Sequence, residues 1–136
     1  MIIYLDIDGV LLANEFQAAA YADEFLRVVL TKYPNSTYWL TTHCWQGVNN
    51  TVGVLQPALK PETMVLIKRI KSTNWDELKT DGIDFSQPFL WFDDDLMPEE
   101  RNILVAHGVQ DCWVGVDLAK NPNQLRVLVP LLGDQD

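Results

Sequence analysis

Two aspartates separated by a single residue interrupt the apolar start of the chain. The sequence begins MIIYLDIDGVLL, so Asp6 and Asp8 follow a short strand-forming run and come just before Gly9. An ionised carboxylate is costly to bury unless it is paired or holds a cation. The two acids therefore form an Asp-Gly turn at the end of a strand, or they are placed there to take part in chemistry.

Polar side chains also follow two later apolar runs. Thr41 and Thr42 come directly after YWL, and the acidic run 93–95 comes directly after FLWF. Lys79 lies in the connection ahead of that second run. If these apolar runs are neighbouring parallel strands, their carboxylates, hydroxyl and ammonium groups converge on one edge of a sheet.

Strand and helix patterns alternate along the chain and predict the elements that would position these groups. Apolar, β-branched or aromatic runs predict strands at 1–5, 37–40, 64–67, 89–92 and 111–117, although the run at 64–67 is also compatible with a helix. Helical spacing and end signals predict helices at 15–33, 49–59, 72–80, 97–108 and 121–132. This alternation predicts an α/β fold, a doubly wound and mainly parallel five-stranded sheet with helices on both faces.

Length and composition indicate a single globular domain over residues 1–136. The net charge of −9 and the lack of a Lys/Arg-rich stripe argue against broad nucleic-acid binding. No apolar run is long enough to cross a bilayer and no signal-peptide pattern is present, so we expect a cytoplasmic protein with no membrane partner. The oligomeric state is left open by the sequence.

The order of these motifs resembles that of the haloacid dehalogenase (HAD) superfamily. YLDIDGVLL is similar to its first motif, an apolar strand followed by Asp-x-Asp-Gly-(Thr/Val). YWLTT is similar to the second motif, and FLWFDDD to the fourth, an apolar strand that ends in an acidic pair. The third motif is a lysine, for which Lys79 is the best candidate, and the resemblance extends over nearly the whole chain.

The resemblance implies a phosphatase that works through an aspartyl-phosphate. Asp6 would be the nucleophile, since a carboxylate is already ionised at neutral pH and needs no neighbouring base. Asp8 would protonate the leaving oxygen and then deprotonate the attacking water. The substrate would be a phosphorylated molecule.

The same resemblance implies a magnesium site next to the nucleophile. Asp6, the main-chain carbonyl of Asp8 and a carboxylate from Asp93 or Asp94 would hold Mg²⁺, whose preferred ligands are hard oxygens. Thr41 and Lys79 would bind the phosphoryl oxygens and spread the charge of the transition state.

Some of these roles have competing candidates. Thr42 could replace Thr41, and Lys68 or Lys71 could replace Lys79 as the phosphate-binding lysine. Asp95, together with Glu99 and Glu100, is interpreted as helix-start chemistry, because acidic residues complement the dipole at the beginning of a helix.

The connections between the motifs are short. Residues 10–41 and 42–79 are filled by the expected elements and leave no room for the cap domain that HAD enzymes usually carry. We therefore expect an open site that accepts a bulky or macromolecular substrate, unless a second subunit covers it. The alternatives are a receiver-like phospho-acceptor module, a non-catalytic HAD fold used for binding, and phosphotransfer to an acceptor other than water.

Overall fold

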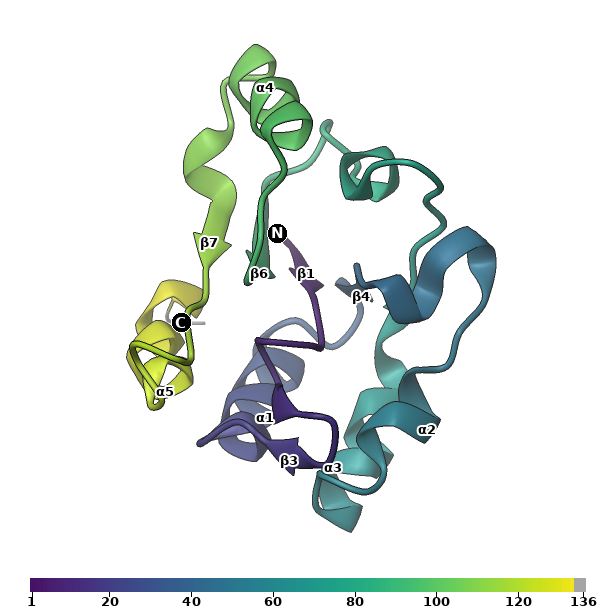
Figure 1. The fold of residues 1–136 in the computed structure, drawn as a ribbon, viewed down its shortest axis with the longest axis vertical. Coiled ribbons are helices and arrows are strands. Elements are labelled where there is room, and N and C mark those ends of the chain that lie inside the picture. Colours follow the sequence, from purple (N-terminus) through teal and green to yellow (C-terminus); the bar gives the residue numbers. More distant parts are fainter. Residues whose placement is uncertain (134–136) are drawn as a thin grey trace.

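The computed structural model describes residues 1–133 and contains one parallel sheet of five strands in the order β5-β4-β1-β6-β7 (Figure 1). All four neighbouring pairs in this sheet are parallel. The α/β class and the parallel five-stranded sheet predicted from the sequence are therefore confirmed. The strands are β1 (Ile2–Leu5), β4 (Thr37–Trp39), β5 (Lys71–Ser72), β6 (Phe89–Asp93) and β7 (Trp113–Gly115).

The chain reverses its direction across the sheet at the central strand. It runs from β1 outward through β4 to β5, then returns to β6 on the other side of β1 and continues to β7. In open α/β sheets, ligands bind beyond the carboxyl ends of the strands at such a switch point. The acidic residues that follow β1 and end β6 lie at this point.

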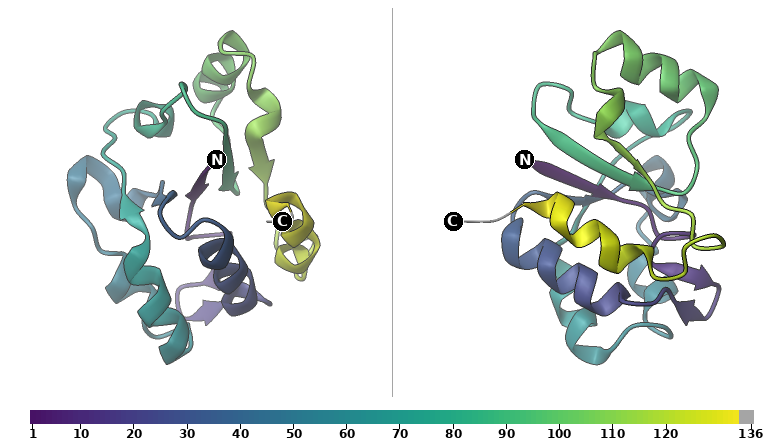
Figure 2. Two further views of the ribbon diagram at one scale, coloured as in Figure 1. Left: turned by 180° about the vertical axis from the view of Figure 1, so that it is seen from behind. Right: turned by 90° about the vertical axis from the view of Figure 1, so that its left-hand side faces the viewer.

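Helices cover both faces of the sheet (Figure 2). Ile3, Leu5 and Phe92 pack on one face in a core shared with α1 (Ala22–Lys32), α2 (Thr51–Leu55), α3 (Pro61–Leu66) and α5 (Gln124–Leu128). Tyr4 and Trp91 point to the other face, where they pack with residues of α4 (Pro98–Ala106) and the segment before β6. This alternation follows from the two-residue period of a strand. No helix among the described residues is long and apolar enough to cross a bilayer.

The predicted third strand at 64–67 is wrong, because most of that run belongs to α3 and Ile67 begins a short 3-10 turn, Ile67–Arg69. Pro61 at the start of α3 fixes a helical backbone angle. The third strand in the chain order of the sheet is β5, which pairs with β4.

The helix predicted at 72–80 is also wrong. Beyond β5 the chain is irregular up to the 3-10 helix Lys79–Gly82. Thr73 donates a hydrogen bond from its hydroxyl to the Trp39 carbonyl, and Trp75 donates one from its indole to the Thr41 carbonyl. These side-chain bonds to β4 and its extension hold the segment in a non-helical course.

The first helix is shorter than predicted, because residues 12–18 form a two-stranded hairpin, β2 (Leu12–Asn14) and β3 (Gln17–Ala18). At the hairpin turn the Asn14 side chain accepts a hydrogen bond from the Phe16 amide and donates one to the Gln17 side chain. Local bonds of this kind compete with helix formation. Phe16, which falls within the predicted helix, lies at this turn and is 73% exposed.

The remaining predicted helices are present in shortened form. The helix expected at 49–59 is reduced to α2, and the one at 97–108 corresponds to α4. The helix expected at 121–132 is divided into α5 and the 3-10 helix Val129–Leu132.

Candidate active site

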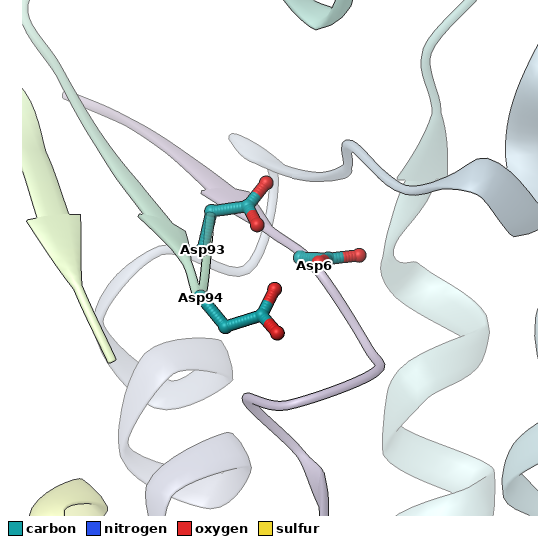
Figure 3. Close-up of side chains that lie close together, drawn as sticks. All are labelled: Asp6, Asp93 and Asp94. Carbon is teal, nitrogen blue, oxygen red and sulfur yellow. The ribbon is translucent and has the colours of Figure 1, made fainter. Parts of the chain in front are cut away.

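Three carboxyl groups meet where β1 and β6 end (Figure 3). Leu5 of β1 pairs with Phe92 of β6, so the next residues, Asp6 and Asp93, lie at matching positions on adjacent strands. Asp94 follows directly. One oxygen from each of the three aspartates lies within 4.8 Å of the others. We call these three residues the carboxylate trio.

Burial disfavours the ionised form of the three carboxyl groups in the trio. Asp93 is fully buried and Asp6 is 5% exposed, whereas Asp94 is exposed as a residue but turns its carboxyl group toward the other two. Burial, followed by the charge of Asp6, raises the pKa of Asp93 to about 6. Burial and then Asp93 raise the pKa of Asp94 to about 6, and burial raises the pKa of Asp6. Such a group favours a bound cation or a bound proton.

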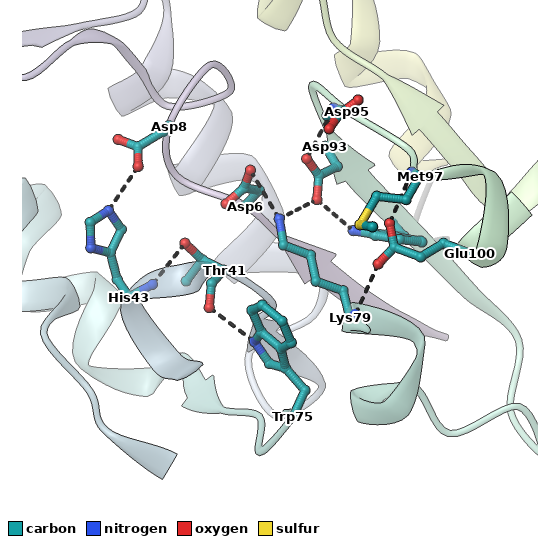
Figure 4. Close-up of polar contacts among 11 residues, drawn as sticks. Asp6, Asp8, Thr41, His43, Trp75, Lys79, Asp93, Asp95, Met97 and Glu100 are labelled. Atoms are coloured by element: carbon teal, nitrogen blue, oxygen red, sulfur yellow. Dashed lines mark hydrogen bonds and ion pairs between the residues drawn. The ribbon is translucent and has the colours of Figure 1, made fainter. Parts of the chain in front are cut away.

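Lys79 provides a positive charge beside the trio (Figure 4). Its ammonium nitrogen lies 2.7 Å from Asp93 Oδ2 and 3.3 Å from Asp6 Oδ2. Burial alone would lower the pKa of Lys79, but the two carboxylates outweigh it and the pKa is raised. The lysine is therefore charged, and its ammonium is held at the sheet edge.

Glu100 fixes the main chain that carries this lysine. Only 3% of Glu100 is exposed, and its Oε2 accepts a hydrogen bond of 2.9 Å from the Lys79 amide. Its other oxygen accepts one of 3.1 Å from the Met97 amide at the start of α4. Glu100 was interpreted as helix-start chemistry, and it does cap the helix, but it also links α4 to the lysine.

The other candidate lysines lie elsewhere. The Lys71 ammonium contacts the Asn35 carbonyl at 3.4 Å and lies over the Tyr38 ring, so it points toward the chain that enters β4. Lys68 is exposed on the 3-10 turn after α3. Of the three lysines, Lys79 is the one that the structure brings to the carboxylate trio.

The two threonines after β4 occupy different positions. Thr41 is fully buried, and its hydroxyl hydrogen-bonds Asp6 and accepts a bond from the His43 amide. The indole of Trp75 donates to the Thr41 carbonyl at 3.0 Å. Thr42 lines the open cavity above the trio. Thr41 is thus placed against the nucleophile candidate, and Thr42 faces the space that a substrate would enter.

Asp8 does not join the carboxylate trio through its side chain. That side chain is 61% exposed, and its Oδ2 lies 2.9 Å from Nε2 of His43 (Figure 4). Asp8 also lines the same cavity as Asp6. The structure therefore separates a buried carboxylate, Asp6, from a solvent-accessible one, Asp8.

The cavity above the trio has a volume of about 390 Å³ and is open to solvent. Among residues 1–133, seven acidic side chains line it, and Lys79 is the only lysine or arginine that does. A phosphate could enter such an acidic site only with its charge offset by Lys79 and a bound cation.

Three contributors were not predicted as site residues: His43, Trp75 and Glu100. His43 contacts the Asp8 carboxylate, and Trp75 donates a hydrogen bond to the Thr41 carbonyl. Both contacts join loops that follow different strands, so no spacing in the sequence signals them. Only the position of Glu100, in the first turn of a helix that begins with proline, carries a recognisable pattern.

Comparison of the chain with protein-family models, with curated proteins and with solved structures gives no match. The function of this chain therefore has to be inferred from its own residues. The site itself consists of three converging carboxylates, one partly buried ammonium, a buried hydroxyl, and a further aspartate at the mouth of the cavity.

Proposed function

We propose that this protein is a Mg²⁺-dependent phosphatase of the HAD type, which hydrolyses phosphate monoesters through an aspartyl-phosphate on Asp6 and has no cap domain. The observation that carries the proposal is the position of Lys79, whose ammonium contacts both Asp6 and Asp93 at the ends of adjacent strands. A partly buried cation beside two carboxylates suits phosphoryl transfer, in which catalysis depends on positioning and charge stabilisation.

The carboxylate trio has the right chemistry for Mg²⁺. Its donors are hard oxygens, which Mg²⁺ prefers. Burial and then the neighbouring carboxyl groups raise the pKa values of Asp93 and Asp94, and a divalent ion would stabilise their ionised forms. Asp6, Asp93 and Asp94 would hold the ion, with the main-chain carbonyl of Asp8 as a further ligand. When bound, Mg²⁺ would neutralise phosphoryl oxygens and so admit an anionic substrate to an acidic cavity.

In the first half of the reaction, a carboxylate oxygen of Asp6 attacks phosphorus and the bond from phosphorus to the leaving oxygen breaks. Asp8, protonated when the substrate binds, gives its proton to that oxygen and becomes a carboxylate. The ammonium of Lys79 and the hydroxyl of Thr41 or Thr42 stabilise the charge on the phosphoryl oxygens.

In the second half, the Asp8 carboxylate takes a proton from a water molecule as the water oxygen attacks phosphorus. The bond from phosphorus to the Asp6 oxygen then breaks, which releases inorganic phosphate and restores both carboxyl groups. The positions of the two aspartates support these roles, because Asp6 lies 3.3 Å from the Lys79 ammonium and Asp8 lies at the mouth of the cavity, where a leaving group and a water molecule can reach it.

The short connections support an open site. The hairpin and α1 occupy the chain between β1 and β4, and α2, α3 and short turns occupy most of the chain between β4 and Lys79. We infer that neither connection forms a cap domain. A phosphate group on a bulky molecule could therefore reach Asp6.

The decisive experiment measures hydrolysis of 4-nitrophenyl phosphate with and without Mg²⁺ in the wild type, Asp6→Asn and Asp8→Asn. We expect turnover that requires the metal and falls by about a thousandfold or more in each variant. Asp111→Asn is the matched control, since it removes an exposed carboxylate outside the site and should retain full activity.

Two results would overturn the proposal. Turnover that survives Asp6→Asn would exclude the aspartyl-phosphate mechanism. A stable phosphoprotein formed with acetyl phosphate, without turnover, would instead identify the protein as a phospho-acceptor module.

A further inference from the structure

A second cavity, of about 370 Å³, adjoins the candidate active site. Asp8 lines both cavities, so the two spaces meet at the proposed acid/base residue. One wall is the β2–β3 hairpin, with Leu12 and Phe16, and the other is α2 and the turn after it, with Gly53, Val54 and Pro57. We call this cavity the hairpin groove; its volume is within the range of small-molecule sites.

Both walls of the hairpin groove are held in place by hydrogen bonds. The Asn14 side chain bonds the Phe16 amide at 3.1 Å and so fixes the turn that presents the exposed Phe16 ring. On the other side, the Asn50 amide donates to the His43 carbonyl at 2.9 Å, which ties the start of α2 to the loop that carries His43. The groove is therefore largely formed before a ligand binds.

The position of Asp8 determines what part of a substrate would occupy the groove. In the proposed mechanism, Asp8 protonates the oxygen of the leaving group, so the leaving group must lie within hydrogen-bond reach of this carboxylate. On one side of Asp8 lies the main cavity, which contains the carboxylate trio. On the other side lies the hairpin groove, which has apolar walls. The apolar body of a leaving group would therefore gain most by entering the groove.

The charges around both cavities restrict the leaving group further. Asp8 and Glu15 line the groove together with His43, and no lysine or arginine in the described part of the chain lines it. Among residues 1–133, Lys79 is the only lysine or arginine that lines the main cavity, and its ammonium is paired with Asp6 and Asp93. A leaving group with a second phosphate or a carboxylate would meet these acids without a counter-charge.

From this geometry, and on the basis of the proposed phosphatase activity, we propose that the hairpin groove binds the leaving group of the substrate. The preferred substrate is then a monoester with a single phosphate and an uncharged leaving group that has an apolar face, of which an aryl group is the simplest. Phe16 packs on that face, and Gly53 keeps the opposite wall open. Apart from its chain neighbours and the backbone of its own helix, no atom of residues 1–133 lies within 4 Å of the position that its β-carbon would take.

The test uses phosphonates, which cannot be hydrolysed and so separate binding from turnover. Calorimetry in the presence of Mg²⁺ compares methylphosphonate, benzylphosphonate and 4-carboxybenzylphosphonate on the wild-type protein. We expect benzylphosphonate to bind about tenfold more tightly than methylphosphonate, equivalent to about 1.4 kcal/mol. The carboxylated ring should lose most of this advantage, since it brings a negative charge beside Glu15 and Asp8.

Two variants assign the effect to the groove. Phe16→Ala removes the apolar wall and Gly53→Leu fills the groove, so each should abolish the preference for the benzyl group and leave methylphosphonate affinity unchanged. Val52→Leu is the matched control, because Val52 lies on the same helix, is 47% exposed and does not line the groove. It should behave as the wild type does.

The outcomes distinguish the two proposals. If the protein hydrolyses 4-nitrophenyl phosphate but binds methyl- and benzylphosphonate equally, or if the variants weaken both ligands alike, the groove assignment is wrong and the phosphatase proposal stands. If it neither hydrolyses phosphate esters nor binds any phosphonate with Mg²⁺ present, the proposed function fails and the groove assignment fails with it.

Discussion

The backbone of Gly9 lies directly against the carboxyl group of Asp94, in the space that a β-carbon at position 9 would occupy. Gly9 also has a φ angle of +78°, a conformation that L-residues with side chains rarely adopt. The glycine that follows the Asp-x-Asp sequence thus allows the chain to turn sharply and allows the last member of the carboxylate trio to approach. A side chain at this position would displace Asp94.

We therefore expect Gly9→Ala to weaken Mg²⁺ binding. Displacement of Asp94 should raise the Kd for Mg²⁺ by about tenfold, the loss of one of three carboxylate ligands. The left-handed backbone should also lower the free energy of unfolding by about 1 kcal/mol. Calorimetric titration gives the affinity, and urea denaturation gives the stability.

Gly108→Ala separates the two effects. Gly108 has a φ angle of +69° and no atom within 4 Å of its β-carbon position, so its replacement adds backbone strain without a steric clash. It should lower stability in the same way and leave Mg²⁺ affinity unchanged. Equal Mg²⁺ affinities for Gly9→Ala and Gly108→Ala would show that Asp94 tolerates the alanine.

Replacement of Lys79 should have a pH-dependent effect on stability. Lys79→Met leaves Asp6 and Asp93 buried without their cation, which should cost about 3 kcal/mol of unfolding free energy above neutral pH. At about pH 5 the cost should be smaller, because a carboxyl group with a raised pKa can take up a proton instead. Urea denaturation at both pH values, without Mg²⁺, measures the difference.

Lys71→Met is the control for this substitution. It removes the same charge from a residue whose ammonium contacts only the Asn35 carbonyl and the Tyr38 ring among the interactions found in residues 1–133. Its effect on stability should be small and the same at both pH values. A Lys79→Met cost that does not change with pH would argue against ion pairing with Asp6 and Asp93.

Mg²⁺ and protons should compete for the carboxylate trio. The pKa of Asp93 is about 6 in the folded protein against an ordinary 3.8, so the folded state binds this proton more tightly than the unfolded state. The stability that protonation of Asp93 contributes is therefore complete below about pH 4 and is lost as the pH rises through about 6. Without Mg²⁺, the protein should be less stable at about pH 7.5 than at about pH 5 by about 1.4 kcal/mol from Asp93, because pH 5 lies about one unit below the pKa of this group.

Added Mg²⁺ should reverse this trend, since it binds the ionised trio. At a hundred times its Kd it should stabilise the protein by about 2.7 kcal/mol at about pH 7.5 and by much less at about pH 5, where protons occupy the site. Thermal denaturation at the two pH values, with and without the ion, tests this. Asp93→Asn should reduce the pH dependence and the response to Mg²⁺ together, and loss of only one would refute a shared site.

The sequence predicted the parallel sheet and the meeting of Asp6 with Asp93, because both depend on local patterns. An apolar run followed at once by an acid, as at Asp6 and Asp93, places a strand and its polar end together. Parallel neighbours then bring those ends to one edge. Asp6 and Asp93 therefore meet even though 86 residues of chain lie between them.

One error occurred where tertiary contacts decide the local structure. The segment from β5 to Lys79 has a helical composition, yet bonds from Thr73 and Trp75 to the chain at the end of β4 hold it irregular. These partners lie 34 residues away and cannot be identified without the fold. The other error has a local cause, because the Asn14 side chain stabilises a hairpin turn at Phe16, where apolar spacing predicted a helix.

Glu100 should position Lys79 as well as stabilise α4. Glu100→Ala removes both the bond to the Lys79 amide and the bond to the Met97 amide, so we expect a loss of about 2 kcal/mol in unfolding free energy. Phosphatase activity, measured well below the unfolding temperature, should also fall about tenfold as the Lys79 segment loosens. Glu99→Ala, at an exposed position in the same helical turn, should change neither quantity much. An unchanged activity in folded Glu100→Ala would limit Glu100 to a capping role.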